Sequence, residues 1–230
     1  MKKNIMKNLI LAAVLAAGIG VPFNSLDAAG EPATLAADSV EYDMASGEAT
    51  ATGNVLFKQG NSRIAGGRAR YNAKTQEASI EGNVIAIRDD MRITCAKITT
   101  DGEEHMQASG GVHGVDGDKS FTGEQVDYYP NQNKYVLIAA GGTLTSGADT
   151  FTADKLEGWL DDAHYVGTGN AHLVSTAKGI EAGGDVADYY GKAQGKVVLT
   201  GNAWATQENN TMKSNRLTIY LADNGEAKVK

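Results

Sequence analysis

A short pattern recurs seven times along this chain of 230 residues: an apolar residue, a small residue two positions later, and an apolar or small residue at position five, often with an aromatic residue at position seven. A period of about thirty residues is typical of one supersecondary unit repeated in a row. Such a stacked array offers a long continuous surface instead of a compact catalytic pocket. The copies begin at Leu35, Ile64, Ile93, Phe121, Phe151, Ile180 and Met212.

A second marker alternates with the first and predicts strands joined by turns. The chain has 28 glycines and 3 prolines, and Gly, Asn and Asp separate short runs rich in Val, Ile, Thr and Tyr. We expect each marker to open a strand and the returning strand to carry the repeated pattern, which gives about thirteen strands. The markers are Gly53-Asn54-Val55, Gly82-Asn83-Val84, Gly110-Gly111-Val112, Gly141-Gly142-Thr143, Gly169-Asn170-Ala171 and Gly201-Asn202-Ala203.

The spacing within the repeated pattern predicts a bulge in each returning strand. Positions zero and five face opposite sides of a regular strand, so an extra residue is needed to place both on one apolar face. Gly66–Gly67 and Gly123–Glu124 lie where that residue falls, and in the sixth copy Gly183–Gly184 move the apolar partner to Val186. Small residues at position two predict a narrow interior, in which Cys95 is a buried small residue.

Residues 1–28 have the layout of a secretory signal peptide. Lys2, Lys3 and Lys7 precede a short apolar run over residues 9–21, and small residues follow, so we expect cleavage after Ala28. The alternative is a retained membrane anchor. The run holds about 13 residues, whereas a spanning helix needs roughly 20, which favours cleavage.

Charge and cysteine content exclude some classes of function. Removal of residues 1–28 changes the formal charge from −7 to about −9, because three lysines and one aspartate are lost. Nucleic-acid binding requires clustered Lys and Arg, so we expect no nucleic-acid partner. Cys95 is the only cysteine, and no internal disulfide can form.

No set of residues in the sequence predicts catalysis. The G-x-S-x-G, H-E-x-x-H, C-x-x-C and phosphate-loop patterns are absent. His113 and His172 occupy the same position of their repeats, which makes a shared metal site conceivable. Both lie one place off the apolar face, so polar residues facing solvent are the favoured interpretation. We therefore expect no enzyme, no cofactor and no metal.

Two segments near the C-terminus carry a resemblance to a known family. Lys196–Trp204 and Met212–Tyr220 form a Gly-Asn strand, a turn and a strand that ends in Tyr. This arrangement resembles the LptA/OstA-like family of periplasmic lipopolysaccharide-transport proteins. It recurs at Gly53–Tyr71 and, more loosely, in the four repeats between. The resemblance implies that residues 29–230 form a twisted β-jellyroll of about six to seven two-armed repeats, whose apolar groove holds the acyl chains of lipopolysaccharide.

An apolar groove would remove the main barrier to moving such a lipid. Each buried methylene is worth roughly 0.8 kcal/mol, so exposing one long acyl chain costs on the order of 10 kcal/mol. Ordinary core packing is the alternative role for the same side chains. The expected lining residues are Val55, Phe57, Ile64, Val84, Ile93, Ile98, Val112, Phe121, Val126, Phe151, Leu156, Leu173, Ile180 and Leu217.

The resemblance also implies partners in both membranes. Family members stand between an LptC-like inner-membrane partner and an LptD-like outer-membrane partner. The repeat is cut within a unit at both ends of the chain, at Leu35–Tyr42 and at Glu226–Val229. We expect unpaired edges there that add a strand from another chain, and a head-to-tail homo-oligomer, since the two edges differ. The alternatives are a structural β-repeat protein of the envelope and the membrane-anchored LptC-like partner itself.

Overall fold

The described chain is almost entirely β-structure. The structure, a computed structural model, describes residues 33–102, 104–190, 195–221 and 227–229, so the expected signal peptide lies outside the described residues. These residues form antiparallel strands β1–β17 and a 3-10 turn, η1 (Thr176–Lys178). The predicted all-β, jellyroll class is confirmed. Within the described part of the chain, no helix has the length and apolar character that a membrane span requires.

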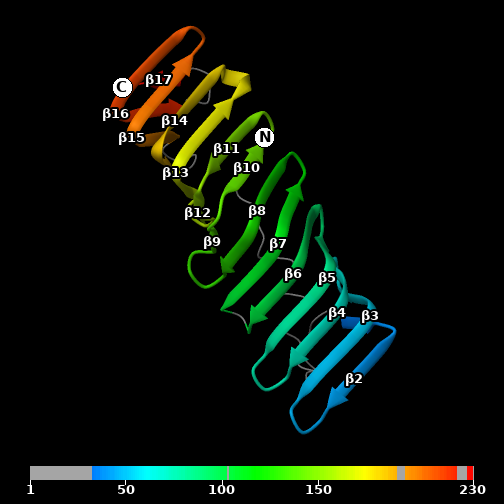
Figure 1. The fold of residues 1–230 in the computed structure, drawn as a ribbon. Helices are drawn as coiled ribbons and strands as arrows, with labels where there is room; N and C mark the ends of the chain where they lie inside the picture. The colour runs from blue at the N-terminus through cyan, green and yellow to red at the C-terminus, as the bar shows by residue number, and fades with distance from the viewer. Residues whose placement is uncertain (1–32, 103, 191–194, 222–226, 230) are drawn as a thin grey trace. The chain divides into compact units, whose positions relative to one another are not determined.

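The chain divides into two compact units. The N-terminal unit holds residues 33–117 and 125–131, and the C-terminal unit holds residues 118–124 and the chain from 132 onward. In Figure 1 the strands of the N-terminal unit, coloured blue to green, follow one another as long hairpins. Its strands are β1 (Ala33–Ala36), β2 (Ser39–Asp43), β3 (Glu48–Gln59), β4 (Ser62–Asn72), β5 (Glu77–Arg88), β6 (Met91–Asp101) and β7 (His105–Asp116).

Strand β8 (Lys119–Tyr129) contributes its first half to the C-terminal unit and its second half to the N-terminal unit. The later strands belong to the C-terminal unit. They are β9 (Tyr135–Ile138), β10 (Gly142–Ser146), β11 (Asp149–Ala153), β12 (Lys155–Trp159), β13 (His164–Ser175), β14 (Ile180–Tyr190), β15 (Lys196–Gln207), β16 (Asn210–Leu221) and β17 (Ala227–Val229).

A bulge divides each of the long strands β3–β7 and β13–β16 into two segments. In β3, Gly53 and Asn54 adopt φ of 78° and 49°, the left-handed region that Gly and Asn tolerate best. The register with β4 shifts between Thr52 and Val55. The Gly-Asn pair therefore lies in the middle of a strand and does not open one as the sequence suggested, because the residues before it already pair with the neighbouring strand.

The row of bulges creates two half-sheets in each unit. We call the segments before the Gly-Asn bulges, with their partners, half-sheet A, and the segments after them half-sheet B. The two face each other across the bulge row: a Cβ added to Gly66 would lie 2.7 Å from Cγ1 of Ile80. This close approach agrees with the narrow interior predicted from small residues at position two. Cys95 at that position is buried, as expected.

The predicted bulges in the returning strands are partly confirmed. The register of β4 against β5 shifts between Ala65 and Arg68, which encloses Gly66–Gly67. A shift in β14 lies between Gly183 and Val186. The expectation that Val186 joins the apolar face is wrong, because Ala187 is fully buried and pairs with Leu199.

The sixth copy of the pattern therefore begins two residues later than the sequence indicated. Ala182 pairs with Leu173 on one side and Ala205 on the other, in the same row as Phe151 and Met212. Turn η1 lengthens the hairpin between β13 and β14. The lengthened hairpin places an additional apolar residue, Ile180, two positions before the sixth copy. The sequence pattern therefore indicated Ile180 as the start of this copy instead of Ala182.

Strands β9 to β12 also differ from the expected pattern, since each arm there is divided into two strands. Residues 139–141 separate β9 from β10, and Asp154 separates β11 from β12. The Gly141 amide donates to the Asp154 carbonyl at 2.6 Å, and the Asp154 amide donates to the Gly169 carbonyl at 2.8 Å. These divisions account for part of the difference between β1–β17 and the expected thirteen strands.

Candidate functional site

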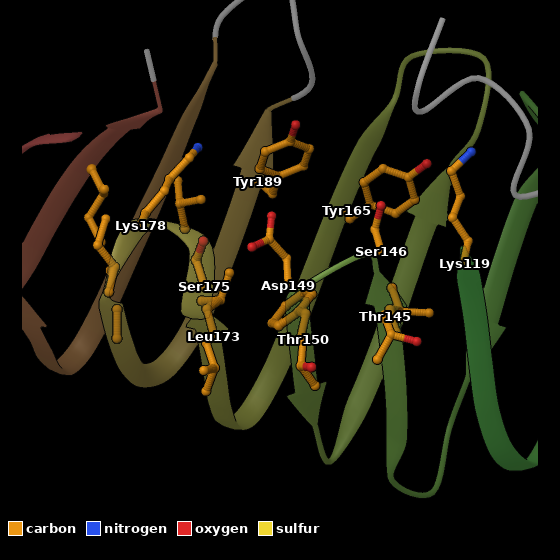
Figure 2. A pocket seen from close by; sticks show the side chains of 17 residues that line it. Lys119, Thr145, Ser146, Asp149, Thr150, Tyr165, Leu173, Ser175, Lys178 and Tyr189 are labelled. Atoms are coloured by element: carbon orange, nitrogen blue, oxygen red, sulfur yellow. The ribbon is translucent and has the colours of Figure 1, made fainter. Parts of the chain in front are cut away.

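The C-terminal unit encloses an apolar cavity between its half-sheets. The cavity has a volume of about 220 Å³. Figure 2 shows the strands curving around it, with the side chains of both half-sheets directed inward. It is lined by Lys119, Leu144, Thr145, Ser146, Asp149, Thr150, Phe151, Tyr165, Leu173, Val174, Ser175, Lys178, Ile180, Ala182, Tyr189, Val197 and Ile219.

One wall is a row of apolar side chains on half-sheet B. Leu144, Phe151, Leu173 and Ala182 are successive cross-strand partners on β10, β11, β13 and β14. The row becomes smaller toward β14, where alanine takes the place of a phenylalanine or leucine. This reduction in side-chain size leaves space beside Leu173 and Ile180.

Glycine on half-sheet A allows the wall to close on one side of the cavity. A Cβ added to Gly167 would collide with the ring of Phe151, which belongs to the opposite half-sheet. Phe151 therefore packs directly on the backbone of β13. Because of this contact, the cavity is bounded by Phe151 near the bulge row and extends toward the hairpin ends of the strands.

Two tyrosines of half-sheet A form the facing wall. The Tyr165 and Tyr189 ring centroids lie 6.0 Å apart, and the two residues are cross-strand partners. Burial raises the pKa of Tyr165 to about 12, with a further contribution from Tyr189. Burial also raises the pKa of Tyr189, and the nearby Asp149 carboxylate adds to that effect. Both phenols therefore keep their protons at neutral pH.

The residues predicted to line a groove are distributed over both units. Phe151, Leu173 and Ile180 line the cavity. Phe121, Leu156 and Leu217 are buried elsewhere in the C-terminal unit. In the N-terminal unit Phe57 is half-buried and is the cross-strand partner of Ile64. The remaining predicted residues of that unit are buried in its core: Val55, Ile64, Val84, Ile93, Ile98, Val112 and Val126.

Sequence reasoning missed the polar and aromatic members of the cavity. Tyr165, Tyr189, Lys119 and Lys178 were not among the expected lining residues, yet all four line it. A signal for Tyr189 existed, because Asp188-Tyr189-Tyr190 repeats the tripeptide at residues 127–129. The central tyrosine is position seven in both copies, counted from Phe121 in one and from the corrected start Ala182 in the other.

The four histidines lie outside this cavity; His113 is exposed, and the other three pair with carboxylates. His105 Nε2 lies 2.8 Å from Asp127 Oδ1, and His172 Nε2 lies 2.8 Å from Glu181 Oε1. His164 Nε2 lies 2.6 Å from Asp188. The described residues contain no group of three or more His, Cys, Asp or Glu side chains arranged to hold a metal ion.

A comparison with protein-family models agrees with the family resemblance seen in the sequence. A family model described as LptA/(LptD N-terminal domain) LPS transport protein matches residues 34–163, which is more than half of the chain. Among solved structures, the chain is similar to LptH, the LptA homologous periplasmic component of the conserved lipopolysaccharide transport device from Pseudomonas aeruginosa, at 16% identity and a TM-score of 0.34. That match covers 63% of this chain and 94% of LptH. No curated protein sequence matches the chain.

Proposed function

Because the chain belongs to the LptA/LptD N-terminal-domain family of lipopolysaccharide transport proteins, we propose that it binds lipopolysaccharide in the periplasm and carries it from the inner to the outer membrane. The family is a transport family and not an enzyme family, so the proposed role is binding without catalysis. The acyl chains lie in an apolar groove between the half-sheets. The cavity in the C-terminal unit is the observation that supports this role best.

The size and lining of the cavity fit a hydrocarbon ligand. An apolar cavity of roughly 150 Å³ stays dry and can hold a benzene molecule. At about 220 Å³, with walls of Phe151, Leu173 and Ile180, this cavity has room for part of an alkyl chain. Each methylene transferred from water into such a site gains roughly 0.8 kcal/mol. Within each unit, the predicted lining residues mark the proposed course of the groove in that unit.

Site-specific photo-crosslinking tests the proposal. A photoreactive amino acid at Leu173, which faces the cavity, should crosslink to lipopolysaccharide in cells. The same residue at His172, the next position of β13, is the matched control, because it points away from the cavity toward Glu181. Crosslinks at His172 but not at Leu173, or at neither position, would contradict a groove between the half-sheets. The second outcome would support the alternative of a ligand-free structural protein.

Strand addition at an edge is the proposed mode of contact with LptC-like and LptD-like partners and with further copies of this chain. Among the described residues, β2 pairs with β3 alone. Val40 and Tyr42 on β2 are 53% and 56% exposed, whereas Ala51, the partner of Val40, is buried. Another strand laid against β2 would bury these two side chains and continue the apolar face.

A membrane-anchored, LptC-like role is the remaining alternative. N-terminal sequencing of the exported protein separates it from the carrier role. A chain that begins at Ala29 supports a released periplasmic protein, and a chain that retains residues 9–21 supports the anchored one.

A further inference from the structure

We propose that the cavity of the C-terminal unit binds an anionic amphiphile, with its alkyl chain between the half-sheets and its acidic head group between Lys119 and Lys178. This inference rests on the proposed function and adds where the head group lies. It commits to a lipid-borne anion, a phosphate or carboxylate attached to an alkyl chain, and not to a free anion.

The two lysines flank the cavity from different elements, a strand and a 3-10 turn. Lys119 begins β8, and Lys178 ends η1, the turn that lengthens the hairpin before β14. Both side chains are half-buried and line the cavity. In Figure 2 their ammonium groups lie on opposite flanks of the pocket and on the same side as the hydroxyls of Tyr165 and Tyr189. Their aliphatic stems thus cover apolar wall while their charges stay at the opening.

Neither lysine is neutralised within the described structure. The ion pairs found there involve Lys97, Lys134 and Lys155, and none involves Lys119 or Lys178. A lysine with no carboxylate partner keeps its full attraction for an external anion. In a chain of net charge −7, two such cations beside one apolar cavity form a local site of the opposite sign.

Hydroxyl groups near the lysines add hydrogen-bond donors. The Ser175 oxygen is buried, lines the cavity and has no hydrogen-bond partner in the described structure. Tyr165 and Tyr189 keep their protons because burial raises the pKa of each phenol. A phosphate or carboxylate accepts hydrogen bonds only, so this set of donors complements it.

Asp149 is the one opposing charge at the cavity. Its carboxylate lines the same space and lies close enough to Tyr189 to raise the pKa of that phenol. With two ammonium groups against one carboxylate, the cavity carries a formal charge of about +1. Removing Asp149 should therefore strengthen the binding of an anion, which gives the proposal a test of opposite sign.

The test compares two ligands with the same alkyl chain. Dodecyl phosphate and uncharged dodecyl maltoside are titrated against the full chain containing bound N-phenyl-1-naphthylamine, a neutral apolar fluorophore, and its displacement is measured. The Lys119→Gln/Lys178→Gln variant should bind dodecyl phosphate about tenfold more weakly, since each half-exposed charge pair is worth up to about 1 kcal/mol. Its binding of dodecyl maltoside should be unchanged.

Matched variants and the salt dependence distinguish binding at this site from a general electrostatic attraction between the ligand and the protein. Lys58→Gln/Lys213→Gln removes the same charge outside the cavity and should bind both ligands as the wild type does. Asp149→Asn should bind dodecyl phosphate about two- to threefold more tightly, as expected for loss of one partly exposed repulsive charge. Raising the salt concentration should weaken the binding of dodecyl phosphate only.

Each remaining outcome counts against a defined part of the proposal. If neither ligand displaces the fluorophore, the proposed lipid-binding function itself fails. If both ligands bind and the lysine variant weakens neither, or weakens both equally, the cavity binds alkyl chains but the head-group site is wrong. Inorganic phosphate alone should displace nothing. Displacement by inorganic phosphate would indicate a free-anion site and overturn the proposal.

Discussion

Asp127 illustrates how a single buried carboxylate is stabilised in this fold. Its side chain is 6% exposed, and it accepts hydrogen bonds from Gln107 at 2.9 Å and Gln125 at 2.7 Å, with His105 Nε2 at 2.8 Å. Burial acts to raise the pKa of Asp127, but the hydrogen bonds from Gln107, Gln125 and His105 outweigh it and lower that pKa. The ionised form is therefore the one that stabilises the folded chain.

A lowered pKa in the folded state predicts a defined pH dependence. The stabilisation is present above the unfolded pKa of about 3.9 and is lost as the pH falls through the lower folded value. Asp127→Asn should reduce the free energy of unfolding by about 1–3 kcal/mol at pH 7, and this difference should shrink below about pH 4. Urea unfolding across this pH range measures it, with exposed Asp118→Asn as the control. A difference that stays constant with pH would contradict the assignment.

Cys95 should be chemically inert in the folded protein. Burial raises the pKa of its thiol to about 11, although backbone hydrogen bonds involving Lys97 and Ser109 act in the opposite direction. At pH 8 only about one thiol in a thousand is then ionised, and the thiolate is the reactive form. A thiol reagent should react slowly with the native chain and rapidly in denaturant. Equal rates in the two conditions would show that Cys95 is accessible.

At the scale of residues, the sequence identified apolar lining residues better than polar ones. Phe151 and Leu173 followed from the repeat because their apolar character is periodic, whereas Ile180 precedes the start of its copy at Ala182 and reaches the cavity from the hairpin that η1 lengthens. Lys119 and Lys178 sit beside turns, where lysine is ordinary, so nothing in the sequence distinguished them. Their placement at one cavity depends on the hairpin that η1 lengthens, and its effect on register was visible only in three dimensions.

At the scale of elements, the Gly-Asn bulge is held by a recurring side-chain contact. Asn54 donates to Asp38, Asn170 to Asp154 and Asn202 to Asp185, at 2.8–3.1 Å. Asp185 belongs to β14, whereas Asp38 lies between β1 and β2 and Asp154 between β11 and β12. The preference for Asn at positive φ was predictable, but the sequence analysis did not identify the aspartate contact, although the aspartate precedes the asparagine by 16 residues in two copies and by 17 in the third.

Two glycines at positive φ should respond differently to substitution. Gly201 has φ of 72°, and an added Cβ would collide with the Asp185 carboxylate. Gly111 has φ of 69° and open space around it. Gly201→Ala should cost about 1–3 kcal/mol from strain and collision. Gly111→Asn, which restores the residue found in other copies, should be neutral or stabilise by up to about 1 kcal/mol.

Thermal and urea unfolding of these two variants gives the measurement. Asn202→Gly is a useful companion to Gly201→Ala, because glycine removes the contact with Asp185 and accepts the φ of 48° at this position without strain, and it should cost about 0.5–1.5 kcal/mol. If Gly201→Ala were no more destabilising than Asn202→Gly, the collision with Asp185 would not determine the choice of glycine at that position.

At the scale of the whole molecule, the exposed apolar side chains of β2, Val40 and Tyr42, predict self-association. Val40→Lys/Tyr42→Lys should reduce concentration-dependent self-association in sedimentation velocity, because charges on an edge strand oppose strand addition. Met44→Lys adds a charge in the adjacent turn, where Met44 is already 86% exposed, and serves as the control. A wild-type chain that stays monomeric at all concentrations would remove the basis for head-to-tail assembly.

The repeat predicted a continuous array, but it did not predict the division into two units. The pattern runs through Phe121, Val126 and Tyr128 without interruption, although β8 contributes to both units. Periodicity reports the local pairing of each strand with its neighbours. It carries no information about how tightly successive groups of strands pack, so the division could not be read from the sequence.

The bulge row also makes the length of a unit independent of its cross-section. Adjacent strands lie about 4.8 Å apart, so each two-stranded repeat lengthens a unit by about 10 Å. The backbone geometry at the bulges sets the cross-section, and it recurs at four Gly-Asn pairs whose residues both adopt positive φ: Gly53–Asn54, Gly82–Asn83, Gly169–Asn170 and Gly201–Asn202. On the proposed function, gain or loss of repeats would change the length of a unit, and substitutions at inward positions would change which ligand is bound, each without altering the other.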